Sequence, residues 1–150
     1  MRFERLNIAS SEAGSSLLEV ALLLPMLLLV LMGVADFGRA YYLAIEVAGA
    51  AHAGAVYGAQ NIIDTTGMQN AAKLNSPDVG GLVATGSWGC ECSDGTALSA
   101  SCSITPTCSV NVVYYAKVNA TATYHPMMPW KGISSSITIT RSTTMRSASE

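Results

Sequence analysis

Charge is scarce in this chain of 150 residues, of which only 12% are Asp, Glu, Lys or Arg, and the formal net charge is −2. The few basic residues form no cluster along the sequence. A nucleic-acid-binding surface needs such a cluster to neutralise phosphates, so the sequence excludes this class of function.

Catalytic and metal-binding patterns are missing as well. The sequence has no P-loop, no Gly-rich dinucleotide turn, and no Ser, His and acid set or carboxylate pair at a recognisable spacing. His52 and His125 lie far apart, and no cysteine or carboxylate near either has the spacing of a metal ligand. We therefore expect a protein that is not an enzyme and that carries no cofactor and no metal.

Apolar residues are abundant and are concentrated in residues 17–34, where eighteen positions contain nine leucines and one charge, Glu19. As a helix this segment is roughly 27 Å long, close to the roughly 30 Å of a bilayer's hydrocarbon core. Leucines at about −0.5 kcal/mol each outweigh an off-centre carboxylate, which costs less than the roughly 2.5 to 3.5 kcal/mol of a central one. The pattern predicts a single membrane span, which Pro25 bends rather than breaks.

The arginines give the span a direction. Arg2 and Arg5 precede it and Arg39 follows it, which weakly favours a cytoplasmic N-terminus. An alternative interpretation is an ordinary signal peptide removed near Ala35, which would leave a secreted soluble domain. Against it, a helix-compatible sequence continues to Gly58 instead of turning polar.

Four cysteines gather in a Gly-, Ser- and Thr-rich stretch far from the apolar segment: Cys90, Cys92, Cys102 and Cys108. An even cluster in a small exported domain predicts two disulfides, and oxidised cysteines are not nucleophiles. Four cysteines permit three pairings. Strands that fold back on each other favour the nested one, Cys90 with Cys108 and Cys92 with Cys102.

Small residues recur at every fourth position after the span, in two series: Ala40, Ala44 and Ala48, then Ala50, Gly54 and Gly58. This spacing places them on one face of a helix and lets a neighbour approach closely. Two interpretations stay open, contact with another helix and packing against the protein's own domain.

The rest of the chain predicts a small α+β domain. Residues 66–74 form a short helix capped by Thr65 or Thr66, and residues 80–92, 109–124 and 134–145 read as strands. Alternation predicts a core-facing row in the middle strand: Val110, Val112, Tyr114, Val118, Ala120, Ala122 and Tyr124. The last two strands would pair across a loop that contains residues 126–130. The expected fold is a long N-terminal helix, a short helix and an antiparallel sheet of three or four strands.

The string Gly14-Ser15-Ser16-Leu17-Leu18-Glu19, followed by the apolar run, resembles a class III signal peptide of the type-IV pilin kind. The wider string to Tyr42, with Pro25 and the tail Asp36-Phe37-Gly38-Arg39-Ala40-Tyr41-Tyr42, is similar to the TadE-like family of Tad (Flp) pilus proteins. The resemblance covers about residues 13–57 and implies a type-IV pilin-like fold.

The resemblance implies roles for particular residues. A prepilin peptidase would cut after Gly14, removing a leader of residues 1–14 and leaving Ser15 as the new N-terminus. Residues 15–58 would form the membrane and stalk helix, and residues 59–150 an extracytoplasmic domain. Helix packing would use Pro25, Gly33, Gly38, Ala50, Gly54 and Gly58.

By analogy with type-IV pilins, Glu19 is expected to direct the assembly of subunits. A carboxylate one turn inside a bilayer needs a partner, and the new amine of Ser15 would supply one. That ion pair would set the axial register of packed helices. In the alternative interpretation, Glu19 only extends toward the headgroups.

The function implied is that of a pseudopilin or minor pilin in Tad pilus biogenesis. Such a protein would lie in the bacterial inner membrane, with the C-terminal domain periplasmic or extracellular. Its partners would be other pilin subunits, the prepilin peptidase and the pilus assembly platform, with no nucleic acid. The alternative is a membrane-anchored extracytoplasmic adhesion or binding module that does not enter a filament.

Overall fold

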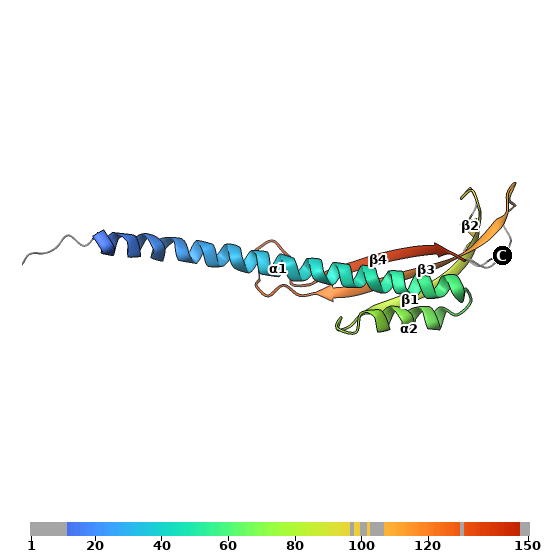
Figure 1. The fold of residues 1–150 in the computed structure, drawn as a ribbon, viewed down its shortest axis with the longest axis horizontal. Coiled ribbons are helices and arrows are strands. Elements are labelled where there is room, and N and C mark those ends of the chain that lie inside the picture. Colours follow the sequence, from blue (N-terminus) through green and yellow to red (C-terminus); the bar gives the residue numbers. More distant parts are fainter. Residues whose placement is uncertain (1–11, 97, 100–101, 103–106, 130, 148–150) are drawn as a thin grey trace, which may run out of the picture. The chain divides into compact units, whose positions relative to one another are not determined.

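The computed structural model describes residues 12–96, 98–99, 102, 107–129 and 131–147. The chain divides into two compact units, Met1–Gly38 and Arg39–Glu150. Helix α1, Glu12–Gln60, belongs to both units. The elements that follow it all lie in the second unit (Figure 1): α2 Thr65–Asn75, β1 Val83–Cys92, β2 Leu98–Ser99, β3 Val112–Tyr124 and β4 Ile137–Arg146.

The described part of the first unit is a helix that continues through Pro25. Its leucines, valines and methionines between Leu17 and Val34 are exposed on the helix surface. Apolar surface in water is unfavourable by roughly 25 cal/mol per Å², and soluble monomers rarely expose a continuous patch of this kind. This part of α1 therefore requires an apolar environment.

Asp64 starts α2. Its Oδ1 accepts a hydrogen bond from the backbone N–H of Gly67 at 2.8 Å, and its Oδ2 accepts one from the hydroxyl of Tyr57 at 2.8 Å. The cap predicted at Thr65 or Thr66 is wrong, because an N-cap side chain bonds the N–H three residues on and Asp64 fills that place. Tyr57 lies on α1, so the same carboxylate joins the two helices.

The four strands form one antiparallel sheet in the order β2-β1-β3-β4. Val118 in the middle of β3 lies opposite Gly86 of β1 and Thr143 of β4, which fixes the register of the three long strands. The predicted α+β fold, with a long helix, a short helix and a small antiparallel sheet, is confirmed.

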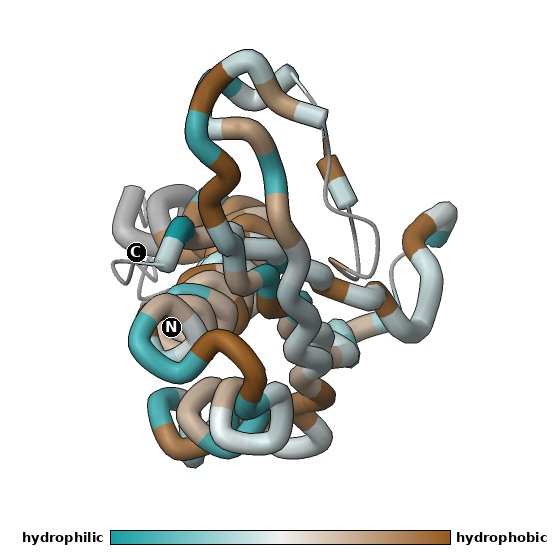
Figure 2. The backbone as a smooth tube through the Cα atoms, turned by 90° about the vertical axis from the view of Figure 1, so that its right-hand side faces the viewer, coloured by the Kyte–Doolittle hydropathy of each residue, from teal (hydrophilic) through white to brown (hydrophobic). Residues whose placement is uncertain are grey.

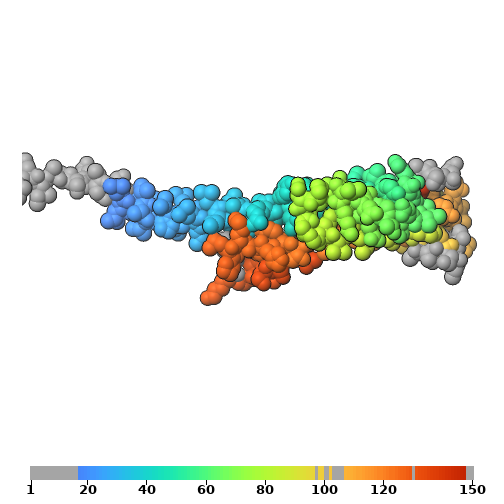
Figure 3. Space-filling model, turned by 90° about the horizontal axis from the view of Figure 1, so that it is seen from below, coloured from blue at the N-terminus to red at the C-terminus, as the bar shows by residue number. Residues whose placement is uncertain are grey.

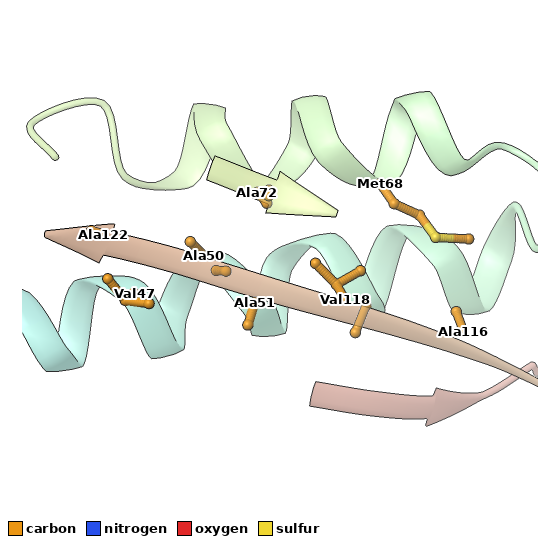
Figure 4. Packing of buried hydrophobic residues seen from close by; sticks show 11 residues of the cluster. Val47, Ala50, Ala51, Met68, Ala72, Ala116, Val118 and Ala122 are labelled. Atoms are coloured by element: carbon orange, nitrogen blue, oxygen red, sulfur yellow. The ribbon is translucent and has the colours of Figure 1, made fainter. Parts of the chain in front are cut away.

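The core of the second unit lies between the two helices and one face of the sheet (Figure 2). Alanines make up most of it, so the backbones approach closely and Met68 is the largest side chain that is fully buried. Figure 4 shows α1, α2 and β3 meeting through these small side chains. The buried cluster consists of Val47, Ala50, Ala51, Ala55, Met68, Ala72, Ala84, Ala116, Val118, Ala120 and Ala122.

The core-facing row of β3 agrees with the prediction only in its second part. Val118, Ala120, Ala122 and Tyr124 are buried. Val112 is half-buried, whereas Val110 and Tyr114 are exposed and Tyr115 is buried instead. The last turn of α1 reaches β3 at Ala116, where a Cβ on Gly58 would lie 2.6 Å from the Ala116 Cβ. Tyr114 lies beyond that contact, and Tyr115 covers Gly89 on the opposite face.

Two disulfides close the far end of β1, as predicted, but the nested pairing is wrong: Cys90 bonds Cys102, and Cys92 bonds Cys108. The cause is β2, a two-residue strand that no periodicity indicates. In β2, Ser99 lies opposite Cys90, so Cys102, three residues after Ser99 in the sequence, is within reach of Cys90. Cys92 faces Val112 at the start of β3 and is therefore reached by Cys108.

Candidate functional site

The residues of the candidate processing site lie at the start of α1. The helix begins at Glu12, so Gly14 and Ser15 are already helical. Glu19 follows four residues after Ser15 and is exposed on the helix surface. Residues four apart share one face at a rise of about 6 Å, so an amine created at Ser15 and the Glu19 carboxylate would face the same neighbour.

Further along the first unit, the other predicted packing residues differ in their surroundings. Pro25 lies inside α1, Gly33 is half-buried and Gly38 is exposed. A Cβ built on Gly38 would meet no atom of the described chain within 4 Å. Close packing at Gly38 would therefore need another molecule.

The second series of small residues packs inside the second unit. Ala50 is fully buried, and a Cβ on Gly54 would lie 2.7 Å from the carbonyl oxygen of Met68. On Gly58 it would meet the Met68 methyl group at 2.9 Å. Of the two interpretations of this spacing, the structure shows packing against the protein's own domain.

A further contact joins β3 to α1 at Arg39, the first residue of the second unit. The guanidinium carbon of Arg39 lies 6.0 Å from the centroid of the Tyr124 ring, within the range of a cation–π interaction. Sequence reasoning missed this contact, because a charge pattern along one helix says nothing about which strand ends beside it. The only available signal was Tyr124 as the last member of the core-facing row.

Two more side chains that the sequence did not single out fix α2 to α1. The hydroxyl of Ser76 is buried and donates a hydrogen bond to the backbone carbonyl of Glu46 at 3.0 Å. At the other end of α2, the N–H of Gly67 and the hydroxyl of Tyr57 hold the pKa of Asp64 below its ordinary value, because both stabilise the carboxylate.

The described residues contain no cluster of three or more His, Cys, Asp or Glu side chains that could hold a metal ion. In the same part of the chain, one helix is long and apolar enough to cross a membrane, the one within Leu17–Gln60, and its most apolar stretch is not buried.

Comparison with protein families decides what the helix is. Residues 14–56 match the family described as TadE-like protein, which confirms the resemblance seen in the sequence. This segment is TadE-like. No curated protein and no solved structure matches the chain.

The TadE-like segment, residues 14–56, begins at the glycine of the candidate processing site and ends inside α1, before Gln60. It contains the exposed apolar part of α1 and also Val47, Ala50 and Ala51 of the core. The family suggests involvement in Tad pilus assembly, and the match covers this segment alone. The TadE-like segment thus contains both the exposed apolar stretch and one wall of the folded domain.

Proposed function

We propose that this chain is a pseudopilin or minor pilin of a Tad pilus assembly system. Residues 17–34 would anchor it in the bacterial inner membrane, with its N-terminus in the cytoplasm. One observation carries the proposal: the TadE-like segment starts at Gly14, and the helix that follows exposes leucines along the length of a bilayer.

The second unit would lie outside the cytoplasm. Its two disulfides, Cys90–Cys102 and Cys92–Cys108, are a feature of oxidising compartments and rare in the bacterial cytosol. The same direction agrees with Arg2 and Arg5 on the N-terminal side of the span.

Association with other pilin subunits would run through the first unit. Its exposed leucines provide nonspecific attraction, since they can pack against any apolar surface. Glu19 would provide the direction: a carboxylate in hydrocarbon is unfavourable unless it is paired, and the amine of Ser15 on the same chain or on a neighbour fits it. The axial register of neighbouring helices would therefore be the one in which the Glu19 carboxylate pairs with a Ser15 amine.

The N-terminus of the chain purified from its host membranes tests the proposal. We expect the mature protein to start at Ser15, and a Gly14→Leu variant to keep the leader of residues 1–14. A protein that keeps Met1 would favour the membrane-anchored binding module. A start near Ala35, with the protein in the aqueous fraction, would contradict anchoring altogether.

Glu19 is tested separately from processing. We expect Glu19→Gln to be cleaved normally but to lose crosslinking to neighbouring pilin subunits in the membrane. Glu19→Asp is the matched control, since it keeps the charge and should keep most of the crosslinking. Normal crosslinking of the Gln variant would mean that Glu19 only extends toward the headgroups.

A further inference from the structure

The connection between β3 and β4, residues 125–136, exposes apolar side chains; we call it the apolar loop. Met127 is 50% exposed, Met128 39% and Ile133 53%. The loop contains Lys131 and His125 but no acidic residue. In Figure 3 it is the orange segment that projects from the second unit.

The two limbs of the loop meet at their base. The His125 ring nitrogen Nδ1 lies 3.2 Å from the carbonyl oxygen of Ser135, which joins the limbs at their base. Between them is a hollow of about 210 Å³, lined by Pro126, Met127, Met128, Pro129, Ile133, Ser134 and Ser135. Pockets for small molecules usually have about 300 to 1,000 Å³, so the hollow is too small to explain the apolar side chains around it.

The loop begins beside the residue with which the second unit starts, Arg39. Arg39 follows the last residue of the span, Val34, by five residues, or about 7.5 Å of helix, which is headgroup depth. Arg39 lies over the ring of Tyr124, and Tyr124 is the last residue before the apolar loop. The loop therefore leaves the second unit next to Arg39, which follows the apolar span by five residues in the sequence.

We propose that the apolar loop inserts into the outer interface of the phospholipid bilayer. Met127, Met128 and Ile133 would meet the upper acyl chains, and Lys131 the lipid phosphates. The second unit would then hold the membrane at two points, the helix and the loop, so its tilt over the bilayer would be fixed. The inference rests on the proposed anchoring, because it needs residues 17–34 in the same membrane.

A depth measurement on the full chain tests the inference. Met128→Cys carries an NBD fluorophore, and the protein is reconstituted at low density into vesicles of phosphatidylethanolamine and phosphatidylglycerol with doxyl-labelled lipid. Ile63→Cys is the matched control: Ile63 is 73% exposed and follows the other end of α1, Gln60, which lies about 32 Å of helix from Arg39. We expect a blue shift and loss of fluorescence at position 128 and neither at position 63.

The outcomes separate the two proposals. If the protein floats with the vesicles but the label at 128 behaves like the label at 63, loop insertion is wrong and anchoring stands. If the protein does not float, both fail. A blue shift at 128 that appears only at high protein density, without doxyl quenching, would mean that a second copy covers the loop and would also overturn insertion.

A second variant guards against an effect of the label. Met127→Glu combined with Ile133→Glu should abolish doxyl quenching at position 128 while flotation continues, since carboxylates are unfavourable among acyl chains and are repelled by anionic phosphatidylglycerol. Unchanged quenching in this variant would contradict insertion through these residues.

Discussion

Asp64 shows how one side chain can organise a junction. It accepts hydrogen bonds from the backbone of α2 and from Tyr57 of α1, so its ionised form is favoured in the folded state. Its pKa is lowered, first by the N–H of Gly67 and then by the Tyr57 hydroxyl. A carboxylate with a lowered pKa adds stability above its unfolded pKa of about 3.9, and this stability is lost as the pH falls through the folded value.

We expect Asp64→Asn to keep the cap, since Asn is also a good N-cap residue. On acidification this variant should lose less stability than wild type. Thermal unfolding followed from neutral pH to below about pH 3 measures this. Asp64→Ala should be less stable than wild type at neutral pH, because the Gly67 N–H loses its partner. If wild type and Asp64→Asn lose stability in parallel on acidification, the assignment is wrong.

Gly54 is a second position where the addition of one carbon atom should change the stability of the second unit. An added methyl group would lie 2.7 Å from the backbone carbonyl oxygen of Met68, which cannot rotate away. We expect Gly54→Ala to destabilise the second unit by about 1 to 3 kcal/mol, as overpacking does. Gly38→Ala, also in α1 but in open space, should leave the unfolding of the second unit unchanged in denaturant titrations.

At the scale of the element, β1 is the strand on which most of the second unit depends. It pairs with β2 and β3, and its last three residues are Cys90, Glu91 and Cys92. Glu91 also pairs with Arg146 of β4 at 2.7 Å, but exposed ion pairs contribute only about 0 to 1 kcal/mol. A disulfide that closes a loop of this size contributes about 2 to 4 kcal/mol, so the disulfides dominate at this end.

The crossed pairing predicts which double variants keep a disulfide. Cys90→Ser with Cys102→Ser should leave no free thiol, because Cys92 and Cys108 still bond each other. Cys90→Ser with Cys108→Ser should leave two reactive thiols and a less stable domain. Maleimide labelling of the denatured, unreduced proteins counts the thiols, and the opposite result would restore the nested pairing.

At the scale of the molecule, the two units differ in what they need. Every residue of the buried cluster lies in the second unit, from Val47 to Ala122. The first unit contributes exposed leucines instead. The second unit thus contains its own core, while the first depends on an apolar surrounding.

We expect a fragment of residues 39–150 to fold in aqueous buffer, with both disulfides formed. Its circular dichroism should show a cooperative thermal transition. The full chain should need detergent or lipid to stay in solution. A fragment that is unfolded or aggregates would show that residues before Arg39 contribute to the core.

The local parts of this structure were predictable and the tertiary parts were not. The apolar run predicted the helix, alternation predicted β3 and β4, and the strand-like sequence of residues 80–92 predicted β1, because these signals lie in neighbouring residues. The pair Leu98–Ser99 of β2 is too short for a period, so the crossed disulfides could not be foreseen. The exposure of Tyr114 depends on where α1 ends above β3, which no alternation within one strand encodes.

The candidate site divides in the same way. Gly14, Ser15 and Glu19 are recognisable because the role proposed for them depends on their order along the chain. The partner of Ala50, Gly54 and Gly58 was not predictable, since small residues permit close approach to any neighbour. Only the positions of Met68 and Ala116 decide that this neighbour is the protein's own domain.

Helix α1 belongs to both units without a loop between them. A tensile load on its N-terminal end would thus reach the second unit through the same helix that carries Gly54 and Gly58. Inside that unit the helix is held by alanine contacts with α2 and β3 and by Met68 against Gly54 and Gly58, so these contacts would be the first in the folded domain to bear the load.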